Sequence, residues 1–125
     1  MQIRVYYEDT DCGGVVYHTN YIKYCERARS EVFFSENFPL ENKGAVFVVK
    51  SLTSDFIKSA KLGDILNINS NIKLLKKASI VMVQEIYKDS EKIFTMEILL
   101  VYVKNGKPTK IDEETLSFFN KFLIR

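Results

Sequence analysis

The sequence has little of what would place the protein in a membrane or in an oxidising compartment. Its longest apolar stretch, residues 98–103, is far shorter than the roughly 20 residues that a membrane-crossing helix needs. The first residues alternate between apolar and polar side chains, unlike the apolar block of a secretory signal. Two cysteines, Cys12 and Cys25, could pair on number alone, but without an export signal we expect reduced thiols. The interpretation is a cytoplasmic protein that is not an integral membrane protein.

The net charge is also small, and residues that commonly bind metals are few. Lysine and arginine number 18 against 16 aspartate and glutamate residues, so a net charge of +2 provides no strong field for a polyanion. The single histidine, His18, and two separated cysteines form no cluster of metal ligands. We therefore expect neither a nucleic-acid partner nor a metal site.

What is present indicates one folded domain. The hydrophobic fraction of 46% and the aromatic fraction of 13% are typical of a globular protein. A chain of 125 residues has room for one proper core, and it contains no internal repeat, low-complexity tract or linker. We predict a single domain over residues 1–125.

Hydrophobic periodicity predicts a long helix and a terminal helix. Apolar side chains recur at helical spacing from residue 21 to residue 32, and Thr19 or Asn20 can cap the start of this helix. Residues 35–44, with Pro39 among them, end it. Near the end of the chain, Asp112 can cap a last helix that runs to about Leu123.

The remaining segments are predicted to be strands joined by short polar turns. They are residues 2–7, 46–53, 64–75, 80–87 and 93–103. Alternation places Tyr7 on the apolar face of the first strand and Leu74 on the apolar face of the third. Short turns favour antiparallel pairing. The fold class is therefore α+β, with an antiparallel sheet of about five strands covered by the long helix.

The run from Tyr6 to Tyr21, Tyr-Tyr-Glu-Asp-Thr-Asp-Cys-Gly-Gly-Val-Val-Tyr-His-Thr-Asn-Tyr, closely resembles the opening motif of the 4-hydroxybenzoyl-CoA thioesterase family. Within that family it resembles the YbgC-like acyl-CoA thioesterases, a branch associated with the Tol-Pal envelope system of Gram-negative bacteria. The likeness continues at residues 25–29, 47–49 and 60–64 and so covers nearly the whole chain.

The resemblance implies a hotdog fold, in which a long antiparallel sheet wraps the central helix. It also implies acyl-CoA as the substrate, a place in lipid metabolism, and no cofactor, because CoA is part of the substrate. Members of the family pair their sheets edge to edge into homodimers, which often assemble into homotetramers. Their active sites lie at the dimer interface and use residues from both chains.

Asp11 falls where the family places its essential carboxylate. The resemblance implies that it either attacks the thioester carbon to form an anhydride or acts as a base on water. From the residues alone, the alternative is a turn that the Asp11 side chain makes beside Gly13 and Gly14. Asp9, two residues earlier, is expected to stabilise the loop or to face solvent.

The helix start near His18 is the second expected element of the site. Free N–H groups and a partial positive charge at a helix N-terminus suit a developing oxyanion, and by resemblance the carbonyl-polarising amide is that of His18. The His18 imidazole could orient water or protonate the departing thiolate, or it could make only local hydrogen bonds. The Tyr7 hydroxyl could contact Asp11 or water, and the alternative is core packing.

Five further residues are assigned to substrate binding. Gly14, Val16 and Tyr17 lie in the motif beside Asp11. Lys76 and Lys77, in a turn between two strands, could bind CoA phosphates from a neighbouring subunit, and the alternative is a solvated turn.

Two other functions are compatible with the same fold. One is a hydratase or dehydratase acting on acyl thioesters, although such enzymes pair a histidine with a carboxylate in a different sequence arrangement. The other is a non-catalytic module that binds acyl thioesters or acyl carrier protein in an envelope or lipid-synthesis complex. The intact Asp11 argues against a purely degenerate binder.

Overall fold

The computed structural model describes residues 1–122 of the chain. The elements, in chain order, are β1 (Gln2–Arg4), η1 (Tyr7–Asp9), α1 (His18–Ser35), β2 (Ala45–Phe56), β3 (Ile65–Leu75), β4 (Ser79–Lys88), β5 (Glu91–Lys104), β6 (Lys107–Pro108) and α2 (Glu113–Asn120). Leu123, the predicted end of the last helix, lies outside the described residues. No helix in this part of the chain combines the length and the apolar character needed to span a membrane.

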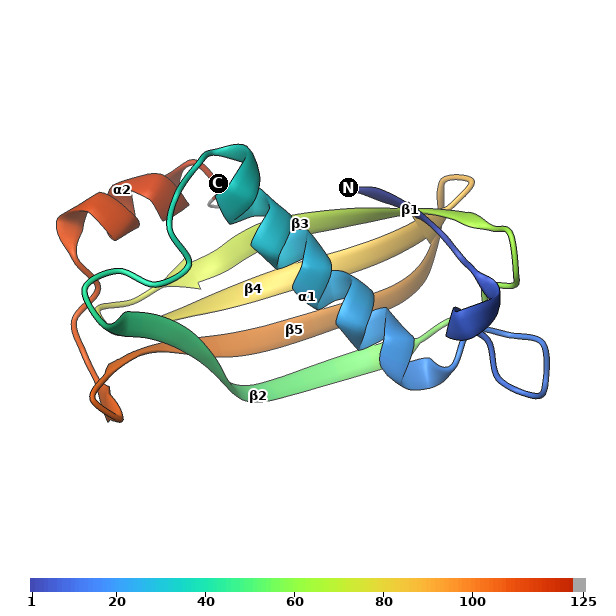
Figure 1. The fold of residues 1–125 in the computed structure, drawn as a ribbon, viewed down its shortest axis with the longest axis horizontal. Helices are drawn as coiled ribbons and strands as arrows, with labels where there is room; N and C mark the ends of the chain where they lie inside the picture. The colour runs from blue at the N-terminus through green and yellow to red at the C-terminus, as the bar shows by residue number, and fades with distance from the viewer. Residues whose placement is uncertain (123–125) are drawn as a thin grey trace.

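All the strands form one antiparallel sheet in the order β1-β3-β4-β5-β2, and the short β6 pairs with β5. The sheet curls around α1, which crosses its concave face diagonally (Figure 1). The strand β2 occupies one edge of the sheet, and β5 is its neighbour there. The predicted α+β hotdog fold, with a short C-terminal helix, is confirmed.

The long helix forms because its apolar side chains line up on the face that meets the sheet. Tyr21, Tyr24, Cys25 and Ala28 are all buried, as the periodicity predicted. Cys25 is fully buried and its thiol pKa is raised to about 12 by burial, whereas Cys12 is exposed in the loop before the helix. The two cysteines are not joined by a disulfide.

The prediction for Leu74 is wrong because β3 is not regular. The pairing of β3 with β4 shifts between Ile72 and Leu74, so Lys73 is an extra residue in the strand. An inserted residue reverses which side chains face the core. Ile72 is fully buried, as expected, but Leu74 is 45% exposed and Leu75 turns towards the core instead.

Candidate active site

The predicted site lies at one end of the sheet, where η1 and the following loop lead into α1 (Figure 1). The loop is a small hairpin in which Thr10 bridges Val16. The Asp11 N–H donates to the Val15 carbonyl at 2.9 Å, and the Gly14 N–H donates to the Asp11 carbonyl at 3.0 Å. This tight turn needs Gly14, whose φ of +80° is in the left-handed region.

Contacts with the segment before β3 fix the hairpin to the body of the protein. The Val16 N–H donates to the Ala60 carbonyl at 2.9 Å, and Val15 bridges Lys61. The Val16 side chain is 3% exposed and belongs to the core, so it does not face the open side of the loop. The second strand of the hairpin is therefore held against the body of the protein, and the tip of the loop is exposed.

The Asp11 side chain is exposed at this tip. Its Oδ1 atom accepts a hydrogen bond from the Gly13 N–H at 2.8 Å, which is the turn contact considered as the alternative to catalysis. Among the described residues, no hydrogen bond or ion pair engages the other carboxylate oxygen. Asp11 thus makes the turn and also presents one carboxylate oxygen to a ligand.

Asp9 stabilises the loop, as one of the two predictions for it stated. Its Oδ2 atom accepts the Tyr6 N–H at 2.9 Å. Its carbonyl accepts both the Tyr17 N–H and the Asn20 side-chain amide at 2.9 Å. These bonds hold the start of α1 against the loop that carries Asp11.

The helix begins without the expected cap. Tyr17 is the N-cap residue and makes no side-chain capping bond, so the prediction of Thr19 or Asn20 as the cap is wrong. The helix starts before these two residues. The Asp9 carbonyl accepts hydrogen bonds from the Tyr17 N–H and from the Asn20 side chain, which leaves Asn20 inside the first turn. In the described part of the chain, the N–H groups of His18 and Thr19 donate to no protein acceptor.

These free amides give the site its electrophilic side. The first turn of α1 contains no acidic residue, so its partial positive charge is not neutralised within the helix. Backbone N–H groups in this position suit an anion or a polarised carbonyl oxygen. The role of the His18 amide stays a prediction, and its N–H group is free to fulfil it.

The His18 side chain is exposed and packs by its ring. The imidazole lies edge-on to Tyr17, with ring centroids 4.7 Å apart, and 6.1 Å from the ring of Phe56 on β2. Tyr17 is 46% exposed beside the helix start, and its predicted role in substrate binding stays a prediction. No hydrogen bond joins His18 to Asp11 within residues 1–122.

The strand position predicted for Tyr7 is wrong. β1 ends at Arg4, and the Asp9 carboxylate then draws the Tyr6 N–H into a turn that begins η1. Tyr7 consequently lies in η1 with 83% of its surface exposed, so the core-packing alternative is also wrong. Its hydroxyl makes no hydrogen bond to Asp11 in the part of the chain that is described.

An aromatic cluster packs beneath the start of α1. The Tyr21 ring stacks on Phe94 at 5.4 Å and meets Phe56 at 5.8 Å. The buried Tyr21 hydroxyl accepts the Ala60 N–H at 2.9 Å. Burial raises the pKa of Tyr21, so its hydroxyl stays protonated at neutral pH. The cluster joins α1 to the segment that anchors the hairpin, a tertiary contact without a sequence motif.

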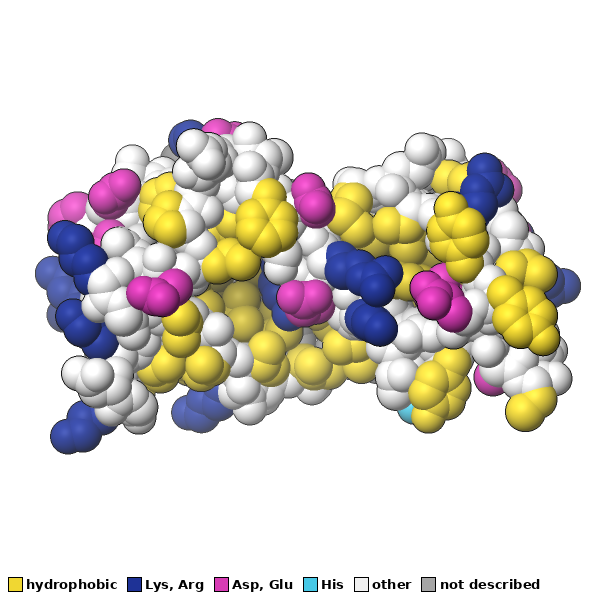
Figure 2. Space-filling view, viewed as in Figure 1, with side chains coloured by type: hydrophobic (Ala, Val, Ile, Leu, Met, Phe, Trp, Pro, Cys, Tyr) yellow, Lys and Arg dark blue, Asp and Glu magenta, His cyan; other side chains and the backbone are white. Residues whose placement is uncertain are grey.

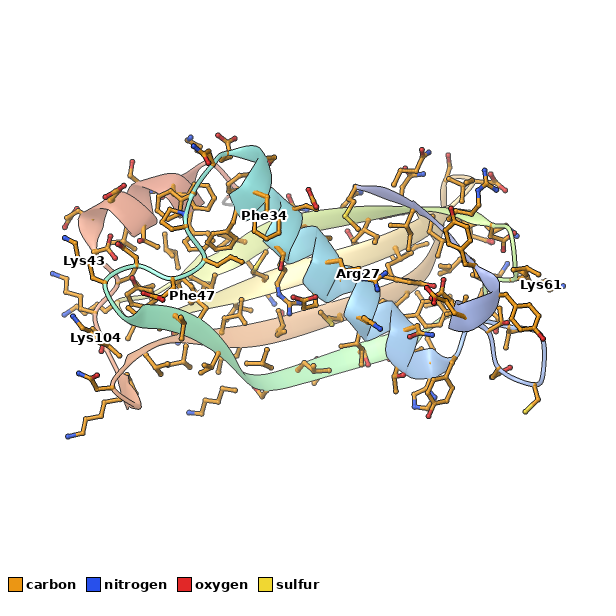
Figure 3. The ribbon with its side chains drawn as sticks, in the orientation of Figure 1. Arg27, Phe34, Lys43, Phe47, Lys61 and Lys104 are labelled. Atoms are coloured by element: carbon orange, nitrogen blue, oxygen red, sulfur yellow. The ribbon has the colours of Figure 1, made fainter. Side chains whose placement is uncertain are left out.

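Lys76 and Lys77 lie at the opposite end of the sheet. They are exposed in the turn between β3 and β4, where the Lys77 carbonyl accepts the Ile111 N–H at 2.7 Å just before α2. The 11 residues of β3 separate this turn from the end that holds the hairpin, a span of roughly 35 Å. Figure 3 shows the two ends, with Lys61 beside the hairpin and Lys43 and Lys104 at the other end. Within one chain, the lysine pair does not meet Asp11.

Comparison with known proteins gives a consistent family. The family model described as the thioesterase superfamily matches residues 13–95. The acyl-CoA thioesterase YbgC of Helicobacter pylori is 58% identical over 87 residues, which cover 70% of this chain and 65% of that protein. The acyl-CoA thioesterase YbgC of Haemophilus influenzae is 36% identical over 124 residues, covering 94% of this chain and 91% of its own length.

A solved structure shows the same architecture. A hypothetical protein from Aquifex aeolicus superimposes with a TM-score of 0.90 at 26% identity, over 95% of this chain and 97% of that one. The fold, the opening motif and the relatives agree. This chain belongs to the thioesterase superfamily.

Proposed function

We propose that the protein hydrolyses acyl-CoA to a free carboxylic acid and CoA. The observation that carries this proposal is the placement of the exposed Asp11 carboxylate on a hairpin that leads directly into the free amides at the start of α1. A carboxylate beside an electrophilic helix N-terminus supplies the two things that thioester hydrolysis needs. The names of the Helicobacter and Haemophilus relatives support the same substrate.

In the proposed reaction, the thioester carbonyl oxygen binds the His18 amide, which stabilises the charge that develops on it. In one route an Asp11 oxygen attacks the carbonyl carbon, the C–S bond breaks, and CoA leaves as a thiolate. Water then hydrolyses the resulting anhydride and restores Asp11. In the other route Asp11 removes a proton from water as the water oxygen attacks the carbon. The C–S bond then breaks, and the proton passes from Asp11 to the departing thiolate. Both routes consume one water and release one acid and one CoA thiol.

The exposed His18 imidazole is proposed to orient water or to protonate the departing thiolate. Tyr7, Gly14 and Tyr17 are proposed to contact the substrate, and the buried Val16 to support the loop beneath it. Lys76 and Lys77 are proposed to bind CoA phosphates. Because the two lysines lie far from Asp11 in their own chain, their role requires a second subunit.

A homodimer through β2, which assembles further into a homotetramer, is therefore part of the proposal. β2 is a 12-residue edge strand, and Val48 and Val49 on it are 41% and 49% exposed. A long apolar edge is a template for pairing with another strand. Sedimentation velocity should show an assembly that Val48→Asp dissociates. Leu74→Asp, equally exposed but on β3, should leave the β2-paired dimer intact.

The cellular setting is proposed on the resemblance alone. It comprises the cytoplasm, lipid metabolism beside the Tol-Pal envelope system, and acyl carrier protein as a possible second thioester carrier.

A thiol-release assay tests the activity. The assay uses a series of acyl-CoA esters of increasing chain length, an aromatic acyl-CoA and an acyl carrier protein thioester. From at least one of them, the purified protein should release one free thiol for each acid formed. A binding module would retain these thioesters intact, and a hydratase would change an enoyl-CoA without releasing thiol. Either of those results across the whole series would overturn the proposal.

A further inference from the structure

A cavity of about 390 Å³ opens between the second half of α1, the first half of β2 and the end of α2. Its walls are mostly apolar and include Val32, Phe33, Phe47, Met82 and Phe119. Figure 2 shows it as a recess with hydrophobic side chains on its floor, in the half of this face that carries α2. Figure 3 shows Phe47 on β2 in the same half.

The cavity is separate from the hairpin in the same chain. Arg29 on its wall is 11 residues after His18 along α1, a distance of roughly 16 Å. None of the residues assigned to the reaction lines it.

Arg29 is the one cation on the cavity wall among the described residues, and it is held in place. Its Nη1 donates to Oε1 of Gln84 at 2.9 Å. Gln84 is completely buried, and its Nε2 donates to the Cys25 carbonyl at 2.8 Å and to the Ser70 hydroxyl at 2.9 Å. This network fixes the guanidinium and leaves its other N–H groups available.

The guanidinium has no carboxylate partner in the described part of the chain. Glu26, one turn earlier, also lines the cavity. Its Oε1 accepts the Ser30 hydroxyl at 3.1 Å, and its negative charge acts on Arg29 without forming an ion pair. Burial lowers the pKa of Arg29, yet a guanidinium remains charged at any physiological pH. A half-buried cation beside apolar walls is costly without an anion.

We propose that this cavity binds an aliphatic carboxylate, with the chain against the apolar walls and the carboxylate on the Arg29 guanidinium. Arginine matches a carboxylate with two parallel hydrogen bonds. The volume is at the low end of small-ligand pockets, which suits an acid of medium chain length. The acid released by thioester hydrolysis has this chemistry, and so does an acyl group with a carboxylate at its far end. Naming the product as the natural ligand rests on the proposed function, whereas the binding itself does not.

Direct binding tests the site with octanoate and its neutral counterpart octanol, by isothermal titration calorimetry. The wild type should bind octanoate saturably and octanol at least about tenfold more weakly. Arg29→Met should lose the preference for octanoate. Arg27→Met is the matched control, because Arg27 is exposed on the same helix and does not line the cavity. It should bind octanoate like the wild type.

A second variant covers the case in which Arg29→Met does not fold. Val46→Phe fills the cavity without touching the Gln84 network, and it should abolish binding of both ligands. The proposed site is wrong if the wild type does not bind octanoate, or if Arg29→Met binds octanoate as tightly as the wild type does. If octanoate does not bind but thiol is released, only the cavity proposal is wrong. If octanoate binds as expected but no thiol is released, only the proposed function is wrong.

Two kinetic arms identify the source of the carboxylate. Inhibition of thiol release by octanoate that Arg29→Met relieves supports the released product as the ligand. A loss of kcat/KM in Arg29→Met for suberoyl-CoA but not for octanoyl-CoA supports a carboxylate on the acyl group itself.

Discussion

The Oδ1 atom of Asp11 accepts the Gly13 N–H at 2.8 Å, and a Cβ atom on Gly13 would lie 3.2 Å from that same oxygen. One carboxylate oxygen is thereby fixed in direction by the turn, and the carboxylate has little room to rotate towards residue 13. The turn therefore fixes the direction of the group to which we assign the proposed catalytic role.

Gly13→Ala should reduce activity without unfolding the protein. The added methyl group pushes the carboxylate from its position, and a misplaced catalytic group costs about tenfold or more in kcat/KM. The loop is exposed, so the free energy of unfolding should change by less than about 0.5 kcal/mol. Gly106→Ala is the control, because Gly106 has a φ of +74° in an unrelated turn. It should cost about 1 kcal/mol of stability and leave kcat/KM unchanged. Full activity of Gly13→Ala would contradict the argument.

Two buried tyrosines on one face of α1 should respond differently to loss of the hydroxyl group. Tyr21→Phe leaves the buried Ala60 N–H without its acceptor, which costs about 1–3 kcal/mol. The Tyr24 hydroxyl is buried without a hydrogen bond of good geometry among the described residues. Burial, and next the nearby negative charge of Asp9, raise its pKa. Tyr24→Phe should therefore be neutral or stabilising. Urea denaturation measures the free energy of unfolding of both variants. A larger loss of stability in Tyr24→Phe than in Tyr21→Phe would contradict this prediction.

Asp112 makes stability depend on acid pH. Burial opposes its ionisation, but hydrogen bonds from the Tyr102 hydroxyl and from the Thr115 N–H and hydroxyl outweigh burial and hold its pKa below the ordinary value. Because the folded pKa is depressed, the stabilisation is present above the unfolded pKa, near 3.9, and is lost as the pH falls below it. The free energy of unfolding should therefore drop between pH 5 and pH 3.

Asp112→Asn keeps a capping oxygen but removes the ionisable group. Denaturation at a series of pH values should give a flatter profile for this variant below pH 5. Some slope remains, because Asp64 also has a depressed pKa: burial opposes its ionisation, but the Lys61 N–H and Lys88 outweigh it. An unchanged slope in Asp112→Asn would show that Asp112 is not the group responsible.

The role of Lys76 and Lys77 has a kinetic test. Changing both to alanine should raise the KM for CoA esters more than the KM for short thioesters that lack the nucleotide, because only CoA carries the phosphates. Lys23→Ala serves as the control, since Lys23 is an exposed lysine on α1. If the double change raises the KM equally for both types of substrate, the proposed contact with the CoA phosphates is wrong.

The sequence predicted the parts of the fold that depend on local periodicity and local hydrogen bonds. The stripe on α1 and the Asp112 cap, whose side chain accepts the Thr115 N–H, are of this kind. The errors arose where tertiary pairing overrides the pattern. An extra residue at Lys73 turned Leu74 outward, and β1 ended at Arg4 because a loop carboxylate bonds the next segment.

The candidate site divides in the same way. Its motif predicted Asp11 and the helix start at His18, because both lie within one short segment. The Arg29–Gln84 hydrogen bond joins residues 55 positions apart, on α1 and β4. No spacing rule links such residues, so the cavity that they border becomes visible only in the folded chain.

Thiol release by Asp11→Asn tests the central claim most directly. The variant keeps the side-chain oxygen that accepts the Gly13 N–H but loses the negative charge, so folding and assembly should match the wild type. Asp89→Asn, at an exposed carboxylate in the β4–β5 turn, is the matched control and should retain full activity. Asp11→Asn should lose nearly all acyl-CoA hydrolysis, by a factor of at least about 100 in kcat. Hydrolysis by Asp11→Asn at the wild-type rate would contradict the central claim.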